Sequence, residues 1–384
     1  MQIISMAVGM LLLALVSGCG GGGGSPAPPV MPPPPPALNT GPESCVNGSA
    51  GSFPCEGISL NKRVSLSTMG GTWGNDLWGW HDTQTGREYA LMGLDTGTAF
   101  VDVTAPEAPI FLGRLPTQTV ASTWRDIKAY GDHAYIVVDN AGNHGMQVFD
   151  LTRLRGVFAP EMFLPDVVYG DFGEAHNLAI NEDTGFAFAV GSDDCGGMHI
   201  ININTPNNPS FAGCHPGDTH DAQCVVYGGP DATHVGREIC VNSNEDHVAI
   251  VDVTDDKIGG NAVTLSTVIY PELAFVHQGW LTEDHRFFLL GDEFDETDFD
   301  TPTRTHVFDV SDLDNPQYLY PYEAATRVTD HNLYILGDLV FQANYSVGLR
   351  VLEFGNLANA EISEIAYFDT LPDSDARDEL GVWS

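Results

Sequence analysis

The chain has 384 residues, and its 52 Asp and Glu against 15 Lys and Arg give a formal charge of -37 at pH 7. Such an excess of carboxylates repels phosphate backbones and anionic lipid surfaces, which argues against nucleic acid as a partner. The charge is typical of a solvated acidic surface, and it makes divalent cations at acidic loops more plausible.

Residues 1–18 are predicted to be a signal peptide. Residues 7–16 form an apolar run that is too short to span a bilayer, and small residues follow it. The string Val16-Ser17-Gly18-Cys19 resembles a bacterial lipobox, in which the cysteine carries the lipid and becomes the mature N-terminus. No Lys or Arg precedes the run, so an ordinary secretory signal with a free Cys19 stays open as the alternative.

Residues 19–41 are predicted to be a tether between that lipid and a folded domain. Gly20–Gly24 and the proline-rich run Pro26–Pro36 cannot build a core, and they give a flexible and then a stiff spacer. Gly20 after the cysteine resembles the pattern that sends lipoproteins to the outer membrane. We therefore expect an outer-membrane lipoprotein at the cell surface, held to the membrane by its N-terminal lipid.

The domain predicted at residues 42–384 contains a pattern that returns about every 50 residues. Each copy opens with a basic residue or a histidine and then Asp, Asn or Gln, and most copies continue into an apolar strand. The copies begin at Arg125-Asp126, His176-Asn177, His220-Asp221, His277-Gln278 and His331-Asn332, with a weaker first copy at Asn75-Asp76. Such a period predicts a repeat architecture.

A second landmark keeps the same interval and places Asp or Asn between two apolar residues. It occurs at Val101-Asp102-Val103, Phe149-Asp150-Leu151, Ile201-Asn202-Ile203, Val251-Asp252-Val253 and Phe308-Asp309-Val310. Proline-bounded turns follow three of these copies, and proline marks the ends and edges of strands because it cannot donate to a ladder. Each repeat therefore predicts four short antiparallel strands, and the chain predicts an all-β propeller with six full four-stranded blades.

The cysteines indicate disulfide bonds. Of seven cysteines, Cys19 is the predicted lipid site, and an even number in the rest of an exported chain is typical of disulfides. Proximity in the sequence favours the pairs Cys45–Cys55, Cys195–Cys214 and Cys224–Cys240. A metal site built on thiolates is the competing interpretation, although no Cys-x-x-Cys pair occurs.

An acidic run lies inside the fifth repeat. Its carboxylates belong to Asp292, Glu293, Asp295, Glu296 and Asp298. Alternating carboxylates on one loop supply the oxygen ligands that calcium prefers. The spacing lacks the order of an EF-hand loop, so a solvated loop remains the alternative.

Longer strings in the domain resemble a known family. Thr98–Thr104 and Val248–Asp255 resemble the LVIVD repeat of extracellular β-propellers. Thr219–Cys224 and Gln342–Leu352 are similar to segments of the bacterial choice-of-anchor B proteins, and this similarity runs from about Cys45 to the last residue. The resemblance implies an exported propeller anchored by varying devices, and it brings no established catalytic residues.

The two ends of the domain predict how the ring closes. In that family a Gly-x-Trp-Ser string opens a final repeat, and Gly381-Val382-Trp383-Ser384 are the last residues here. We therefore expect the start of a seventh blade in a chain that is shortened at its C-terminus. Residues 61–69 have no repeat of their own, and we expect them to supply a strand to that incomplete blade.

The innermost strands of a propeller line its central channel, so equivalent repeat positions converge. The five pairs from Arg125-Asp126 to His331-Asn332 are therefore expected on one rim or wall of the channel. Three interpretations stay open: hydrogen bonds that tie the blades together, binding of a ligand or anion, and binding of a transition metal such as zinc or copper. We expect neighbouring inner strands to lie too far apart for all four histidines to share one ion.

Two functions follow from these observations. The first is a surface-tethered binding module for an extracellular protein, glycan or peptide, because no nucleophile elbow, P-loop, His-Glu-x-x-His motif or dinucleotide fingerprint is present. The second is an exported, metal-dependent enzyme with its site in the histidine-lined channel, for which calcium or a transition metal is the candidate cofactor. Propellers host both classes, and we favour the binding module.

Overall fold

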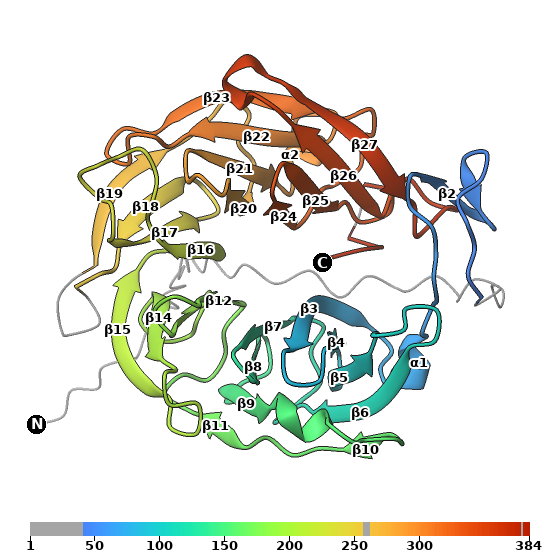
Figure 1. Cartoon of the computed structure of the whole chain (residues 1–384). Helices are drawn as coiled ribbons and strands as arrows, with labels where there is room; N and C mark the ends of the chain where they lie inside the picture. Colours follow the sequence, from blue (N-terminus) through green and yellow to red (C-terminus); the bar gives the residue numbers. More distant parts are fainter. Residues whose placement is uncertain (1–40, 256–261, 378) are drawn as a thin grey trace, which may run out of the picture. The chain divides into compact units, whose positions relative to one another are not determined.

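The computed structural model describes residues 41–255, 262–377 and 379–384, and these residues form six β-sheets arranged in a ring (Figure 1). The chain divides into two units, residues 1–32 and 33–384, and every described residue belongs to the second. Each sheet contains a blade of four strands joined by antiparallel pairing, and two of the sheets carry additional strands on their outer edge. The predicted all-β propeller with six four-stranded blades is confirmed. The predicted signal peptide and nearly all of the predicted tether, including Cys19, lie outside the described residues.

The first three blades follow one another along the chain, each from its innermost strand outward. Blade 1 contains β3 (Gly74–Asp82), β4 (Arg87–Leu94), β5 (Gly97–Asp102) and β6 (Ile110–Pro116), with β10 (Glu161–Met162) added outside β6. Blade 2 contains β7 (Arg125–Tyr130), β8 (His133–Val138), β9 (Met146–Asp150) and β11 (Val167–Tyr169). Blade 3 contains β12 (Asn177–Asn181), β13 (Phe186–Val190), β14 (Gly197–Asn202) and β15 (Ser210–Pro216).

The last three blades continue in the same order, and blade 6 also receives the N-terminal hairpin. Blade 4 contains β16 (Asp221–Val226), β17 (Glu238–Ser243), β18 (Val248–Asp252) and β19 (Val263–Val268). Blade 5 contains β20 (Val276–Leu281), β21 (Phe287–Asp292), β22 (Arg304–Asp309) and β23 (Gln317–Glu323). Blade 6 contains β24 (Leu333–Leu336), β25 (Leu339–Ala343), β26 (Leu349–Phe354) and β27 (Ile362–Phe368), with β2 (Phe53–Glu56) and β1 (Ser49–Ala50) outside β27.

The helices are short. In the described part of the chain they are α1 (Leu66–Met69), α2 (Asp295–Asp298) and the 3-10 turns at Leu151–Leu154 and Leu357–Asn359. Within the described ranges, no helix combines the length and apolar character that crossing a membrane would need.

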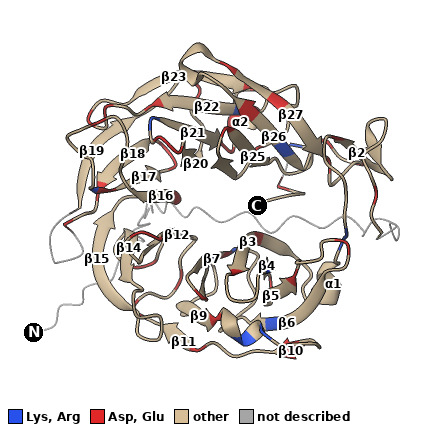
Figure 2. Cartoon of the chain, viewed as in Figure 1, with Lys and Arg blue, Asp and Glu red and all other residues tan. Residues whose placement is uncertain are grey.

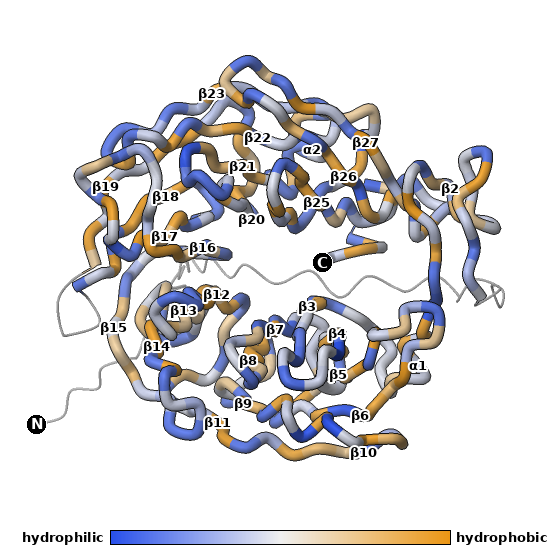
Figure 3. Tube along the Cα trace, viewed as in Figure 1, coloured by the Kyte–Doolittle hydropathy of each residue, from blue (hydrophilic) through white to orange (hydrophobic). Residues whose placement is uncertain are grey.

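The hydrophobic core lies between neighbouring blades. Blades 1 and 2, for example, share a cluster in which the stacked rings of Phe100 and Phe149 have centroids 4.7 Å apart. Because both faces of a middle strand contact other blades, β8 and β21 are nearly continuous apolar runs and not alternating ones. Figure 3 shows these apolar residues along the strands inside the ring.

The second sequence landmark has a local structural cause. At the end of each third strand, the Asp or Asn side chain accepts a hydrogen bond of 2.9 to 3.0 Å from the backbone N–H two residues later. The accepting residues are Asp102, Asp150, Asn202, Asp252 and Asp309. This Asx turn ends the strand and starts the connection to the outer strand, so the landmark recurs once in each of the first five blades.

The predicted disulfides are confirmed. Cys45–Cys55, Cys195–Cys214 and Cys224–Cys240 are all bonded, so none of these six sulfurs is available as a thiolate ligand. Three disulfides indicate an extracellular or periplasmic protein.

The structure corrects two expectations about the ends of the domain. Residues 61–69 do not form a strand, since Leu66–Met69 is the helix α1, and the hairpin β1–β2 pairs with β27 of blade 6 instead. Gly381–Ser384 do not begin a seventh sheet, because six blades already bring the first and last inner strands together. Trp78 of β3 contacts Tyr334 of β24 edge to face, and Figure 1 shows the C-terminus inside the ring.

Candidate functional site

Four histidines lie at or just before the start of the innermost strands of blades 3 to 6, and the ring arrangement brings them together. The rings of His176, His220, His277 and His331 form a continuous row, with centroids 4.4, 4.4 and 4.2 Å apart from one blade to the next. We call these four residues the imidazole row. The spacing between inner strands is therefore small enough for each imidazole to contact the next.

Hydrogen bonds at Nδ1 fix the orientation of three rings in the row. Nδ1 of His176 lies 2.9 Å from the carboxylate of Asp139. Nδ1 of His220 lies 3.2 Å from the carbonyl oxygen of His277, and Nδ1 of His331 bonds to the carbonyl oxygen of Trp383. When Nδ1–H donates to a carbonyl, Nε2 keeps its lone pair and can bind a metal or accept a hydrogen bond.

Burial keeps most of the row uncharged at neutral pH. It lowers the pKa of His220 and His277 well below the usual value, and the neighbouring imidazoles lower both further. Burial also lowers the pKa of His331 to about 4. These three neutral rings favour a metal ion or a neutral ligand over an anion held by protonated imidazole.

Glu293 adds a carboxylate to one end of the row. It follows β21 directly, is 7% exposed, and accepts a hydrogen bond from the Tyr345 hydroxyl. Its Oε2 lies 3.8 Å from Nε2 of His277, and one ligand atom from each of His277, Glu293 and His331 lies within 4.8 Å of the others. Burial raises the pKa of Glu293 to about 8. Two histidines and one carboxylate form a donor set that suits zinc or iron.

The polar residues that follow the anchors tie neighbouring blades together. Asp76 accepts a hydrogen bond of 2.9 Å from the backbone N–H of Ile127, and Asp126 accepts one of 2.6 Å from that of Leu178. The Gln278 side chain accepts in the same way from Leu333, and the Asn177 side chain donates to the carbonyl of His220. The interpretation that hydrogen bonds tie the blades together therefore fits these polar positions. The histidines that precede them instead contact one another in the imidazole row.

Two further anchor partners lie beside the same strands. Asp221 accepts a hydrogen bond of 3.3 Å from the Asn177 side chain and lines the channel. Asn332 directly follows His331, and its side-chain oxygen is buried with no hydrogen-bond partner among the described residues.

Arg125 occupies the anchor position of blade 2 but lies apart from the row. Its side chain is buried, and its Nε donates to the carbonyl of Leu94 in blade 1 at 2.9 Å. Burial lowers the pKa of Arg125 to about 10. The guanidinium thus turns toward the neighbouring blade, which a shared repeat position does not reveal.

The channel also contains a cavity of about 110 Å³, which is lined by residues of all six inner strands. Sequence reasoning missed its central cation, Lys128, whose Nζ lies 2.6 Å from Asp126 and 3.7 Å from Asp76. The ammonium also sits 4.6 Å from the ring centre of Trp78. Burial opposes the charge, but the two carboxylates raise the pKa of Lys128, so it remains a structural cation. The sequence did contain a signal for Lys128, because it lies on the same inner strand as the blade 2 anchor pair, two residues after Asp126.

The acidic run of the fifth repeat is largely buried. Asp292, Asp295 and Glu296 are fully buried, while Asp298 is exposed on α2. Figure 2 shows α2 as a concentration of acidic residues within the ring. The solvated-loop interpretation therefore fails for these three carboxylates and for Glu293, which is also buried. Burial and the charge of Asp295 raise the pKa of Glu296 to about 10.

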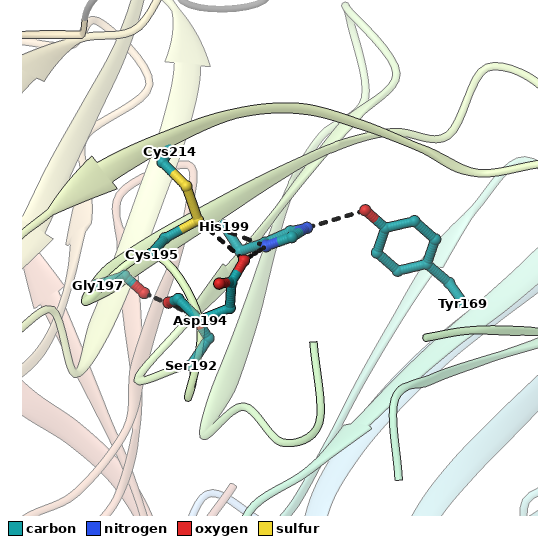
Figure 4. The surroundings of a disulfide bond; sticks show 7 residues. All are labelled: Tyr169, Ser192, Asp194, Cys195, Gly197, His199 and Cys214. Carbon is teal, nitrogen blue, oxygen red and sulfur yellow. Dashed lines mark hydrogen bonds and ion pairs between the residues drawn. A yellow bond between two sulfur atoms is a disulfide. The ribbon is translucent and has the colours of Figure 1, made fainter. Parts of the chain in front are cut away.

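A separate polar cluster surrounds the disulfide Cys195–Cys214 (Figure 4). The buried His199 lies between the Asp194 carboxylate, 3.0 Å from its Nδ1, and the Tyr169 hydroxyl, 2.9 Å from its Nε2. Asp194 also borders a cleft of about 390 Å³ between blades 2 and 3. Because the Cys195 sulfur is bonded to Cys214, the cluster lacks the thiolate that a metal would need from it.

Comparison with known proteins gives the fold and leaves the family undecided. No protein-family model and no curated protein sequence matches the chain. A Bacteroides fragilis protein provisionally assigned as a 6-phosphogluconolactonase is similar in structure, with 12% identity, a TM-score of 0.55, and coverage of 85% of this chain and 92% of that one.

Two further solved structures are similar at the level of the fold. A periplasmic gluconolactonase from Pseudomonas aeruginosa has 13% identity and a TM-score of 0.50, covering 75% of this chain and 86% of its own. A protein from Lactobacillus plantarum has 15% identity and a TM-score of 0.50, covering 77% and 82%. These likenesses support the propeller fold, and the resemblance to the choice-of-anchor B proteins stays a prediction.

Proposed function

We propose that the protein is an exported propeller that binds its ligand at the imidazole row, through a first-row transition metal ion held by His277, Glu293 and His331. The observation that carries this proposal is the convergence of their ligand atoms within 4.8 Å of one another. Such a set leaves coordination positions open, and the next rings of the row, His220 and His176, adjoin it.

The surroundings of the three residues support metal binding. The Nδ1 bond from His331 to the Trp383 carbonyl orients that ring and directs Nε2 away from the bond. The Tyr345 hydroxyl holds Glu293 in the same way. A metal ion would also remove the cost of keeping the Glu293 carboxylate buried beside neutral imidazoles.

We further propose that the propeller is a lipoprotein anchored through Cys19 and displays this site at the cell surface. The lipobox-like string, the Gly- and Pro-rich tether and the three disulfides support export, and the LVIVD-like repeats agree with a choice-of-anchor B protein. The ligand class that fits is an extracellular protein or glycan with a group able to coordinate a metal.

A metal-dependent hydrolase is the second candidate. Two histidines and a carboxylate with open positions would let a metal polarise a carbonyl group, and this observation favours an enzyme over a passive scaffold. The gluconolactonases among the similar structures suggest lactones as the first substrates to assay. Turnover by metal-loaded protein that is lost in Glu293→Gln would favour the enzyme, and binding without turnover would favour the binding module.

Titration of zinc, iron(II) and copper(II) into the metal-free full-length protein tests the proposal by calorimetry. We expect one ion per chain, and at least about a tenfold loss of affinity in His277→Ala, Glu293→Gln and His331→Ala. His247→Ala is the matched control, because His247 is a partly exposed histidine outside the row. Equal affinity in all four variants, or no binding by the wild type, would contradict the proposal.

A further inference from the structure

The cavity of about 110 Å³ in the channel is a separate candidate binding site, because none of the three proposed metal ligands lines it. It lies between the six inner strands that surround the centre of the ring in Figure 1. Glu182, an exposed residue of the lining, marks the side on which the cavity meets solvent. A protein cavity of about 150 Å³ holds benzene, so this one admits a compact group of about four or five non-hydrogen atoms. A whole sugar ring with its hydroxyl groups is too large for it.

Three aromatic rings form one side of the cavity. Tyr334 of β24 lies between Trp280 of β20 and Trp78 of β3, with ring centroids 5.1 and 6.0 Å away. Both contacts are edge to face, with interplanar angles of 68° and 74°, so the rings stand as adjoining walls and do not form a flat platform. Each of these residues is partly exposed. The faces of such rings attract a cation that enters between them.

The polar part of the lining carries more negative than positive charge. Lys128 is already compensated, because its ammonium lies 2.6 Å from Asp126 and 3.7 Å from Asp76. Asp221 has no Lys or Arg within 4.0 Å in the described part of the chain, and it accepts hydrogen bonds from the Asn177 amide and from the backbone N–H of the next residue. Burial raises the pKa of Asp221 to about 6 although Lys128 acts in the opposite direction, so at pH 7 the carboxylate is ionised and incompletely compensated.

The hydrogen bonds of the lining select one kind of cation. A primary ammonium must place each of its N–H donors on an acceptor. The side-chain oxygens of Gln223 and Gln278 already accept from the backbone N–H groups of Leu281 and Leu333, at 2.7 and 2.8 Å. Both oxygens of Asp221 also accept hydrogen bonds. A quaternary ammonium has no N–H donors, so it suits this lining better than a primary one.

We propose that the cavity binds the quaternary ammonium group of a free small molecule, a function beyond the metal site proposed above. The cation lies against the rings of Trp280 and Tyr334 and beside the carboxylate of Asp221, and we call these three residues the channel cage. Lys128 lies 4.6 Å from the ring centre of Trp78, and no described Lys or Arg lies over the other two rings. Aromatic cages are a recurrent means of recognising quaternary ammonium groups. The formal charge of -37 also attracts cations to the ring.

Isothermal titration calorimetry of the full-length protein, freed of metal with EDTA, tests the proposal with three small probes. Tetramethylammonium carries the charge without N–H donors, methylammonium carries the charge with donors, and tert-butanol has a similar shape without charge. We expect one tetramethylammonium ion per chain, bound at least about tenfold more tightly than either of the other probes. Potassium chloride at matched concentration controls for ionic strength.

Two variants test the channel cage itself. Trp280→Leu keeps an apolar side chain and removes the aromatic face, and Asp221→Asn keeps the shape and removes the charge. Each should weaken tetramethylammonium binding at least about tenfold, with circular dichroism as the check that the variant is folded. Asp246→Asn is the matched control, because the side chain of Asp246 is 85% exposed and lies outside the cavity. Glu293→Gln loses a proposed metal ligand and should keep its affinity for tetramethylammonium, so failure of the metal site and failure of the cage are distinguishable.

The wild type alone is enough to overturn the proposal, so no variant has to fold. The absence of saturable tetramethylammonium binding would exclude the site, and equal affinity for tert-butanol would indicate a cavity that does not select for charge. Tighter binding of methylammonium would contradict the assignment to a quaternary ammonium. Choline and phosphatidylcholine vesicles present the same trimethylammonium group, free or at a membrane surface. We expect choline alone to bind, and a preference for the vesicles would contradict a free ligand.

Discussion

At the scale of single residues, buried histidines determine how the protein responds to acid. His144 in blade 2 is fully buried, and its Nδ1–H donates to the carbonyl of Gly145 at 2.8 Å. Burial lowers the pKa of His144 to about 4, from 6.5 in an unfolded chain. Between these two values the unfolded state binds the extra proton, so stability is complete above pH 6.5 and falls as the pH approaches 4.

This difference in pKa predicts a loss of about 3 kcal/mol in the free energy of unfolding between pH 7 and pH 4 from His144 alone. Urea denaturation across that range measures it. His144→Gln lacks the titrating group, so its stability should depend less steeply on pH than that of the wild type. Identical pH dependence in the two proteins would show that His144 does not contribute.

At the scale of elements, the hairpin β1–β2 protects a sheet edge. Without it, β27 would present unpaired backbone groups on the outside of blade 6, and exposed edges invite pairing with other chains. Cys45–Cys55 closes the hairpin, and Phe53 packs on Phe368 with ring centroids 5.4 Å apart. The disulfide is therefore expected to protect solubility as well as stability.

Replacing Cys45 and Cys55 with serine should lower the free energy of unfolding by about 2 to 3 kcal/mol, given the short loop that the bond closes. Light scattering should also show concentration-dependent association. Serines at Cys195 and Cys214 are the control, since that bond links the connection after β13 to β15 and does not hold a covering hairpin. Association by the control alone would argue against edge protection.

The elements also explain what the sequence predicts and what it does not. Asx turns depend on local contacts, and the anchor partners bond to the equivalent strand of a neighbouring blade, so a period of about 50 residues is enough to place six blades. The disulfides join nearby segments, which is why proximity finds them. Glu293 and Trp383 meet the row through contacts between segments that are separate in the sequence, and Arg125 turns away at an equivalent position. No repeat period gives the direction of a side chain.

At the scale of the whole molecule, side chains fill the seam between blades 1 and 6. The four blade strands of blade 6 come from the C-terminal region, and the N-terminal hairpin β1–β2 pairs only on their outside, against β27. Trp383 fills this seam: it is 7% exposed and contacts Trp73 at 6.0 Å and Tyr345 at 5.8 Å between ring centroids. The Ser384 hydroxyl then donates to Asp76 of β3 at 2.8 Å.

This closure makes Trp383→Ala a test of the whole ring. Removing a large, nearly buried aromatic side chain should lower the free energy of unfolding by about 3 kcal/mol. Affinity for a transition metal should fall as well, because the backbone carbonyl of Trp383 orients His331 and loses its fixed position when the indole is removed. Urea denaturation and metal titration measure the two effects, with Phe158→Ala as a control at an aromatic residue that is 89% exposed. An unchanged denaturation midpoint would mean that the contact between Trp78 and Tyr334 is sufficient to close the ring. A lower midpoint with unchanged metal affinity would mean instead that His331 is oriented independently of the seam.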